Sequence, residues 1–566
     1  MKKTLKYLKP YTGTVVWGLV FKFVGSVAEL FLPLVLDYII DEVVPVKDTK
    51  MMIILGAAML GLSFIALFGN IIANRFAAHS SGYMTRDLRY DLFRKTSYLK
   101  SSQVDSFTLP SLVSRLTSDT YYVNQAVARS LRLGVRAPIL LIGGVILTFV
   151  LDWRLALVLL ACVPLVTVAV VIITKKSVPM YTTVQRSGDA AVRSMQENIS
   201  GVRVIKALSK TEYEVEKFGA VNDRLTADEF KTNKITSLTN PLATLVLSLG
   251  LVGVIAAGAY LSAEAGTVLA FLSFFTLILN AMLGISKIFV TLSRGVASAE
   301  RIERVLEADE RTEVVGGLPE GDPAYKIEFK DVSFSYNGVE NNLENVSFKV
   351  GAGQTVGIIG GTGSGKTTLI NLLMRFYDAG GGAVYVDGKD VRSYDAGELR
   401  SRFGAAFQSD FLLASSVRDN IDYFRGLKEE EISKAVKCSC ADEFICGLEG
   451  GLGFVLAQKG ANLSGGQKQR LLIARALAGN PDILVLDDSS SALDYATDAK
   501  LRKGLKEYYP DCTKFIVAQR ASAVRYADII VVLDDGKAVG IGTHEELSAT
   551  CEEYRQICAV QAGGDL

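Results

Sequence analysis

The stretch "TVGIIGGTGSGKTTLINLLMRF", residues 355–376, decides the fold of the second half of the chain. A β-rich run from Thr355 to Ile359 enters a glycine-rich loop, and a helical pattern follows it. The loop matches G-x-x-x-x-G-K-[ST], a pattern that also has chance matches, but the strand–loop–helix context favours a phosphate-binding loop. The loop and the start of the helix comprise Gly360, Gly361, Thr362, Gly363, Ser364, Gly365, Lys366, Thr367 and Thr368.

The residue types of this loop suit the binding of a nucleoside triphosphate. Glycines let backbone N–H groups approach the phosphates closely, and the following helix N-terminus adds positive potential. Lys366 would reach the β- and γ-phosphates, and the hydroxyl of Thr367 would bind Mg²⁺. The sequence therefore predicts a nucleoside triphosphate and Mg²⁺ as ligands of an α/β P-loop domain.

A second strand carries acidic groups in "DILVLDD", residues 482–488. Asp487 would hold the Mg²⁺ shell, directly or through water. Asp488 stands where a base that polarises the attacking water would lie. A helix-cap cluster is the alternative explanation of an acidic pair at a strand end.

A possible anion site lies between these two motifs, in "NLSGGQKQRLLIARAL", residues 462–477. Small residues and a serine hydroxyl at a helix N-terminus can bind an anion. Ordinary helix capping would explain Ser464 alone, but it does not explain the adjoining Gly-Gly-Gln. The candidate residues are Leu463, Ser464, Gly465, Gly466 and Gln467.

The first half of the chain has the composition of a membrane domain. Of 566 residues 49% are hydrophobic, and the mean hydropathy of +0.28 is too high for an ordinary soluble protein. The net charge of +1 does not create the positive electrostatic field that would attract nucleic acid. Apolar runs long enough to span a bilayer lie at 14–40, 52–74, 134–152, 154–174, 241–261 and 266–291.

The connections between these runs set the expected topology. Long polar stretches at 75–133 and 175–240 carry many Lys and Arg residues, so the positive-inside rule places both stretches and both termini in the cytosol. Their pattern favours spans extended into the cytosol as helices, with a separate soluble insert as the alternative. Glu29 lies centrally in the first run, either facing a substrate cavity or paired with another group.

The order of these features resembles the ATP-binding cassette (ABC) transporters, specifically the half-transporters of multidrug-type bacterial exporters. The resemblance covers nearly the whole chain. It implies a six-span α-helical transmembrane domain followed by an α/β P-loop nucleotide-binding domain. The expected boundaries are 1–305 for the membrane domain, 306–325 for a linker and 326–566 for the nucleotide-binding domain.

The same resemblance assigns further roles. Tyr336 matches the aromatic that stacks on adenine, although it could be an ordinary strand tyrosine, and Gln408 matches a glutamine that touches Mg²⁺ and the attacking water. Residues 463–467 match the signature motif, and "SALD", ending at Asp494, matches the D-loop. Coupling helices are expected at 117–124 and 199–208. In this family two chains pair head to tail, and each ATP lies between Walker A (the P-loop, residues 360–367) of one chain and the signature of the other.

The chain departs from the family pattern near the expected chemistry. Asp488 replaces the usual Glu, Gln519 replaces the usual switch His, and Gln458 replaces a common Glu before the signature. An Asp carboxylate is one methylene shorter, and a misplacement of about 1 Å can cost on the order of 10²-fold in rate. Gln519 can donate a hydrogen bond but cannot become a cation or carry a proton.

These departures predict a site that binds Mg-ATP and hydrolyses it slowly. Because the signature is intact, we expect a heterodimer in which this chain completes the competent site of a different half-transporter. A homodimer with two slow sites and an ATP-binding regulatory membrane subunit are the alternatives. The expected setting is a bacterial plasma membrane, with an amphipathic small molecule, lipid or peptide as substrate and no nucleic acid partner.

Overall fold

The computed structural model describes residues 2–310, 313–408, 411–489 and 493–562. The chain folds as two compact units. The first comprises Met1–Ser97 and Thr108–Ala308, and the second comprises Tyr98–Phe107 and Asp309–Leu566.

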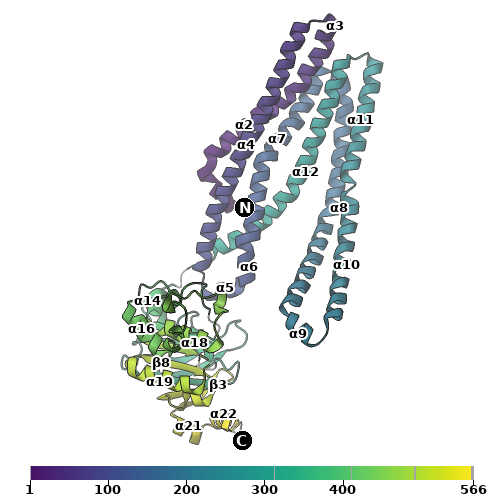
Figure 1. Ribbon diagram of the computed structural model, residues 1–566. Coiled ribbons are helices and arrows are strands. Elements are labelled where there is room, and N and C mark those ends of the chain that lie inside the picture. The colour runs from purple at the N-terminus through teal and green to yellow at the C-terminus, as the bar shows by residue number, and fades with distance from the viewer. Residues whose placement is uncertain (1, 311–312, 409–410, 490–492, 563–566) are drawn as a thin grey trace. The chain divides into compact units, whose positions relative to one another are not determined.

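The first unit is helical throughout its regular structure (Figure 1). Its long helices are α2 (Thr12–Tyr38), α4 (Thr49–Ser97), α7 (Thr120–Leu151), α8 (Trp153–Ser200), α10 (Thr211–Thr236), α11 (Thr239–Leu261) and α12 (Ala265–Glu307). Short segments are α1 (Lys2–Leu5), η1 (Lys6–Tyr11), η2 (Ile39–Val43), α3 (Val44–Val46), α6 (Leu109–Ser114), η3 (Arg115–Asp119) and α9 (Val202–Ala207). Helix α2 packs along α4, α7 along α12, and α8 along α10 and α11.

Most of the expected spans correspond to helices that are long and apolar enough to cross a membrane. Among the described residues these segments are Lys3–Val46, Thr49–Ser97, Leu109–Leu151, Thr244–Leu261 and Ala265–Ile285. The span expected at 154–174 lies in α8, whose described apolar segment is the shorter Trp153–Cys162. At most 33% of any spanning window is buried, so most of its apolar side chains face outward, as contact with lipid requires.

The first long polar stretch reverses direction earlier than predicted. Residues 117–124 do not form a turn, because they lie inside η3 and α7. The reversal follows Ser97 and contains α5 (Ser101–Phe107), which belongs to the second unit. It ends at Thr108, whose φ of 62° is left-handed, with Pro110 in the first turn of α6. In the second stretch α9 lies at the turn, within the predicted range 199–208.

The second unit contains two sheets. One has the strand order β2–β1–β4–β5 and the other has the order β10–β9–β3–β8–β7–β6. The first comprises β1 (Ile327–Phe334), β2 (Leu343–Val350), β4 (Gly381–Val386) and β5 (Lys389–Asp390), all antiparallel. The second comprises β3 (Thr355–Gly360), β6 (Phe403–Ala406), β7 (Ile483–Asp487), β8 (Thr513–Ala518), β9 (Ile529–Asp534) and β10 (Lys537–Gly542); only β10 is antiparallel to its neighbour.

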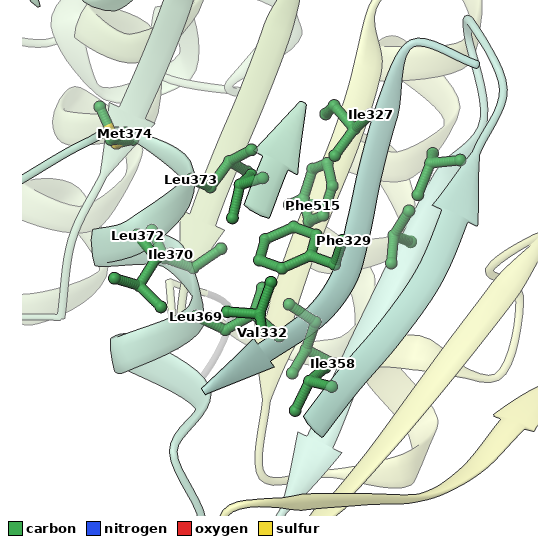
Figure 2. Close-up of a cluster of buried hydrophobic side chains, with 14 of the residues drawn as sticks. Ile327, Phe329, Val332, Ile358, Leu369, Ile370, Leu372, Leu373, Met374 and Phe515 are labelled. Carbon is green, nitrogen blue, oxygen red and sulfur yellow. The ribbon is translucent and has the colours of Figure 1, made fainter. Parts of the chain in front are cut away.

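Helices of the second unit cover these sheets. They are α13 (Lys366–Leu373), α14 (Ala396–Ser401), α15 (Val417–Asp422), α16 (Glu429–Cys438), α17 (Asp442–Ile445), α18 (Gly465–Leu477), α19 (Tyr495–Tyr508), α20 (Ala521–Val524), α21 (His544–Thr550) and α22 (Glu552–Ala562). Figure 2 shows Leu369 and Leu373 of α13 beside Phe329 of β1 and Phe515 of β8, all buried in one core. Burial of these side chains anchors the helix that follows the glycine-rich loop.

A second core joins α15, α16, α18 and α19, and it includes Leu463. The helical unit together with this α/β unit confirms the predicted fold class.

Candidate nucleotide-binding site

The parallel strand order gathers the predicted site residues at one edge of the sheet. Strands β3, β8, β7 and β6 are neighbours and parallel, so their carboxyl ends share that edge. Gly360 ends β3, Asp487 ends β7, Gln519 follows β8, and Gln408 follows β6 by two residues. Ligands of open α/β sheets bind outside the carboxyl ends of the strands.

The glycine-rich loop requires its glycines at defined positions. A Cβ on Gly360 would lie 2.0 Å from the carbonyl oxygen of Leu533 on β9. Gly363 and Gly365 have φ angles of 85° and 98°, which L-residues with side chains rarely adopt. The fold therefore needs Gly360 for close strand packing, and it needs Gly363 and Gly365 for the turn into α13.

Lys366 folds back over the loop. Its Nζ donates to the carbonyl oxygens of Gly360 at 2.9 Å and Gly361 at 2.6 Å. Burial lowers the pKa of this lysine, and the nearby charges of Asp487 and Asp488 oppose that shift. An ammonium held in this way can exchange carbonyl oxygens for phosphate oxygens when a nucleotide enters.

Thr367 and Asp487 offer oxygen ligands for a cation. The Thr367 hydroxyl donates to Oδ2 of Asp487 at 3.2 Å, and Asp487 is only 3% exposed. Burial raises the pKa of the Asp487 carboxyl, while the hydrogen bond from Thr367 counteracts the rise.

These groups fit Mg²⁺, which prefers hydroxyl and carboxylate oxygens and takes few of them from protein when substrate phosphates supply the rest. The described residues include no group of three or more His, Cys, Asp or Glu side chains that could hold a metal without phosphates. Thr367, Asp487 and Gln408 are thus the side chains suited to Mg²⁺, which would neutralise developing phosphate charge.

Asp488 accepts a hydrogen bond from Gln408, the glutamine predicted to contact the attacking water. Gln408 Nε2 donates to Asp488 Oδ2 at 3.3 Å. The backbone N–H of Asp488 donates to the carbonyl oxygen of Val517 on β8 at 2.9 Å, and its φ is 50°. Aspartate tolerates this left-handed conformation better than most residues.

Gln519 follows β8 directly and its side chain is exposed. A residue of the C-terminal helix α22 holds the backbone around it. Gln561 Nε2 donates to the Gln519 carbonyl oxygen at 2.8 Å, and the Ala521 N–H donates to Gln561 Oε1 at 2.7 Å. Sequence reasoning missed Gln561, because it lies 42 residues beyond Gln519 and belongs to no motif.

Tyr336 stands beside the helix of the phosphate loop. Asn371 Nδ2 of α13 donates to its hydroxyl at 3.0 Å. Its ring meets those of Phe334 and Tyr377 edge-on, with centroids 4.8 and 5.0 Å apart, and the residue remains 46% exposed. A braced but accessible aromatic ring can serve as a platform for a nucleobase.

The residues of the signature pattern lie at the start of α18. Gln467 N–H donates to Ser464 Oγ at 3.3 Å, and Ser464 N–H donates to Gln467 Oε1 at 2.9 Å. This capping box shows that Ser464 and Gln467 serve the helix itself. Gly465 and Gly466 form its first turn, and Leu463 anchors it in a core different from that of α13.

The remaining predicted residues are placed as follows. Asp494 caps α19 by accepting from the Thr497 N–H at 2.8 Å. Ser491 of the expected D-loop lies outside the described residues. Thr362 is exposed in the loop, and Thr368 is buried on α13. Gln458 is exposed at the start of the short helical turn η6 (Gln458–Gly460).

Two family profiles match the chain. The profile described as "ABC transporter transmembrane region" matches residues 15–282. The profile described as "ABC transporter" matches residues 343–491. The first match lies on the helical unit, and the second lies on the unit that carries the phosphate loop.

The similarity to known proteins extends over nearly the whole chain. "Uncharacterized ABC transporter ATP-binding protein YfiB" of Bacillus subtilis (strain 168) is 34% identical over 571 residues, covering 100% of this chain and 99% of the relative. "ATP-dependent lipid A-core flippase" of Vibrio vulnificus (strain YJ016) is 29% identical over 574 residues, covering 99% and 97%. The solved structure of a bacterial Atm1-family ABC exporter with ATP bound superposes with a TM-score of 0.82 at 22% identity, covering 97% and 98%, and so shares the fold.

Proposed function

The chain belongs to the ABC transporter family, and from this premise we propose that it exports an amphipathic substrate across a bacterial plasma membrane. It is a multi-pass membrane protein of the ABC exporter half-transporter type, and such proteins couple ATP hydrolysis to transport as dimers. The substrate class proposed here is an amphipathic small molecule, lipid or peptide. The name of the Vibrio relative, a lipid A-core flippase, favours a lipid among these.

The proposed orientation follows from the chain path. Helix α12 ends at Glu307, and β1 of the ATP-binding unit begins at Ile327. Because ATP is a cytosolic ligand, the end of α12 belongs on the cytosolic side. The basic end of α4 and the C-terminal part of α8 then lie on the same side, as the positive-inside rule requires. The basic residues in that part of α8 are Lys175, Lys176, Arg186 and Arg193.

We further propose that this chain's own Walker site is impaired in hydrolysis. Lys366, Thr367 and Asp487 form the binding side of the site, with a hydrogen bond between the last two. Asp488 and Gln519 lie at the same sheet edge, where the chemistry would occur. Their side chains lack, respectively, the reach of Glu and the proton chemistry of His.

The same asymmetry supports a heterodimer. The signature residues 463–467 keep their pattern and a capped helix, and in this family they serve the ATP bound by the other chain. The signature of this chain can support rapid hydrolysis only if the partner supplies a competent Walker site for it to complete. An impaired Walker site beside an intact signature therefore favours a different partner chain. A homodimer with slow hydrolysis is the alternative; a regulatory subunit is disfavoured because the transmembrane region is complete enough to match its family profile over residues 15–282.

The observation that carries the proposal is the pairing of intact binding groups with Asp488 and Gln519. Nucleotide retention tests it. The chain is purified as a dimer with a half-transporter that carries Glu and His at the positions of Asp488 and Gln519. This dimer is loaded with labelled Mg-ATP, desalted and analysed for bound nucleotide. We expect one nucleotide per dimer to remain as ATP, and conversion of both nucleotides to ADP at equal rates would contradict the proposal.

A further inference from the structure

A cavity of about 690 Å³ opens between helices α2, α4 and α7 of the membrane unit. Its charged lining residues are Lys22, Glu29, Arg129, Arg132 and Arg136. Four cationic side chains thus accompany one carboxylate, a formal excess of three positive charges among the described lining residues. Ionisable side chains at membrane depth are costly and mark functional sites.

The single carboxylate is already engaged. Arg136 Nε donates to Glu29 Oε2 at 3.1 Å, and Arg136 Nη2 donates to Glu29 Oε1 at 2.8 Å. Such a bidentate pair is among the strongest charge-assisted contacts in proteins. Glu29 and Arg136 therefore cancel each other's charge, which leaves Lys22, Arg129 and Arg132 to account for the excess.

Lys22 is held by neutral groups. The side chain is 3% exposed, and its Nζ donates to Asn70 Oδ1 at 2.8 Å and to Asn74 Oδ1 at 3.3 Å. Asn70 Nδ2 donates to the carbonyl oxygen of Ala66 at 2.8 Å, which turns the amide oxygen toward the lysine. Amide oxygens satisfy hydrogen bonds of the ammonium but do not compensate its charge.

The two remaining arginines lie on one face of α7 with Arg136, because residues three and seven apart share a helix face. Arg129 Nη1 donates to the hydroxyl of Thr291 at 2.7 Å, again a neutral partner. Arg132 Nε is buried, and no described residue accepts its hydrogen bond. A buried donor without an acceptor is destabilising. An anionic oxygen bound in the cavity could accept the hydrogen bond of Arg132 Nε and remove this cost.

The rest of the lining is largely apolar and includes Leu32, Leu67 and Leu133. We infer that this cavity binds an amphiphile with an anionic phosphate or carboxylate head, which Lys22 and Arg132 contact, and an apolar tail against the leucines. This inference rests on the proposed export function and names its substrate class. Interfacial attraction to lipid headgroups alone would not require a lysine that is 3% exposed.

Binding by the full-length chain in phosphatidylcholine nanodiscs tests the inference without ATP. Myristoyl lysophosphatidic acid and myristoyl lysophosphatidylcholine share a tail and differ in head charge. We expect the anionic ligand to bind at least about tenfold more tightly, because hydrogen bonds to charged groups contribute at least that much. Inorganic phosphate should compete only at concentrations about 100-fold higher, since it lacks the tail.

Substitutions test whether the preference for the anionic head comes from Lys22 and Arg132. Lys22→Gln with Arg132→Gln should reduce the preference for the anionic head to about one. Lys22→Arg and Arg132→Lys should retain it, which keeps the test decisive if the double Gln variant does not fold. Arg94→Gln, at an exposed arginine of α4 outside the cavity lining, should leave it unchanged.

Equal affinities for the two heads, a preference that survives the double substitution, or inorganic phosphate binding as tightly as the lysolipid would each overturn the inference. Its failure differs from failure of the proposed export. Charge-selective binding without ATP-driven transport in inside-out vesicles contradicts export alone. Transport of neutral amphiphiles with no charge preference contradicts the cavity assignment alone.

Discussion

Gln408 Nε2 lies 3.3 Å from Asp488 Oδ2, so the two side chains predicted to contact and polarise the attacking water are hydrogen-bonded to each other. Both residues lie at the carboxyl edge of the sheet, because Gln408 follows β6 and Asp488 follows β7. The neighbouring Asp487 meets the Thr367 hydroxyl at 3.2 Å. The contact between Thr367 and Asp487 suits metal binding, and the contact between Gln408 and Asp488 lies where we propose that water activation is slow.

Restoring the usual family residues should restore turnover. Asp488→Glu combined with Gln519→His should raise the ATPase rate of the assembled dimer, because the carboxylate regains about 1 Å of reach and the switch position regains an imidazole. The rate should rise by about tenfold or more in a coupled phosphate-release assay. Gln458→Glu, a change toward the family pattern away from the sheet edge, is the control. Unchanged hydrolysis in the double variant would show that these departures do not limit turnover.

Removing the P-loop lysine should affect one nucleotide site. Lys366→Ala deletes the ammonium that faces Gly360 and Gly361, so this chain's Walker site should lose most of its ATP affinity while the partner's keeps its own. Equilibrium binding of a fluorescent ATP analogue should fall from two sites to one per dimer. Lys330→Ala, at an exposed lysine of β1, is the matched control. Loss of both sites together would argue against independent binding.

The amide of Gln561 should hold the switch loop in place. Gln561→Ala removes the hydrogen bonds to the Gln519 carbonyl and the Ala521 N–H, each worth about 1 kcal/mol. Amide hydrogen exchange in the peptide covering 519–524 should become several-fold faster, because local opening is less opposed. Gln556→Ala removes an α22 side chain whose Nε2 donates to Glu552 Oε1 at 3.3 Å, and it should leave that peptide unchanged. Equal exchange protection of this peptide in both variants would show that Gln561 does not hold the loop.

Two adjacent glycines of the P-loop should differ in their effect on stability. Gly360→Ala places a methyl group 2.0 Å from the Leu533 carbonyl, so β3 and β9 must separate. Gly361→Ala meets no atom within 4 Å. Thermal unfolding of the ATP-binding unit should shift down by several degrees for Gly360→Ala and hardly at all for Gly361→Ala. Similar shifts for the two variants would contradict the packing described here.

Contiguous motifs made much of this molecule predictable from its sequence. The P-loop, the Asp487 strand and the signature are each short contiguous segments, and the parallel strands β3 and β7 then bring the P-loop and Asp487 to one sheet edge. The first turn was misplaced because residues 109–133 continue the same helical periodicity as the preceding stretch. The reversal was marked only by Thr108 and Pro110.

The contacts that escaped prediction join residues far apart in sequence. Gln561 reaches Gln519 from a terminal helix, and Glu29 meets Arg136 across 107 positions. Sequence alone left Glu29 between a cavity and a pairing role. In the structure Glu29 pairs with Arg136 and lines the cavity between α2, α4 and α7, so the pairing does not remove it from that cavity.

The central claim, that this chain is the hydrolysis-impaired half of an asymmetric exporter, is tested most directly by ATP turnover of the chain alone and of the pair. The chain is purified alone and together with a half-transporter that carries Glu and His at the positions of Asp488 and Gln519, and each preparation is reconstituted in proteoliposomes. Hydrolysis is measured with and without an anionic amphiphile. We predict ATP binding with slow, unstimulated hydrolysis by the chain alone and rapid, stimulated hydrolysis by the pair. Rapid, stimulated hydrolysis by the chain alone would contradict the claim and establish the homodimer.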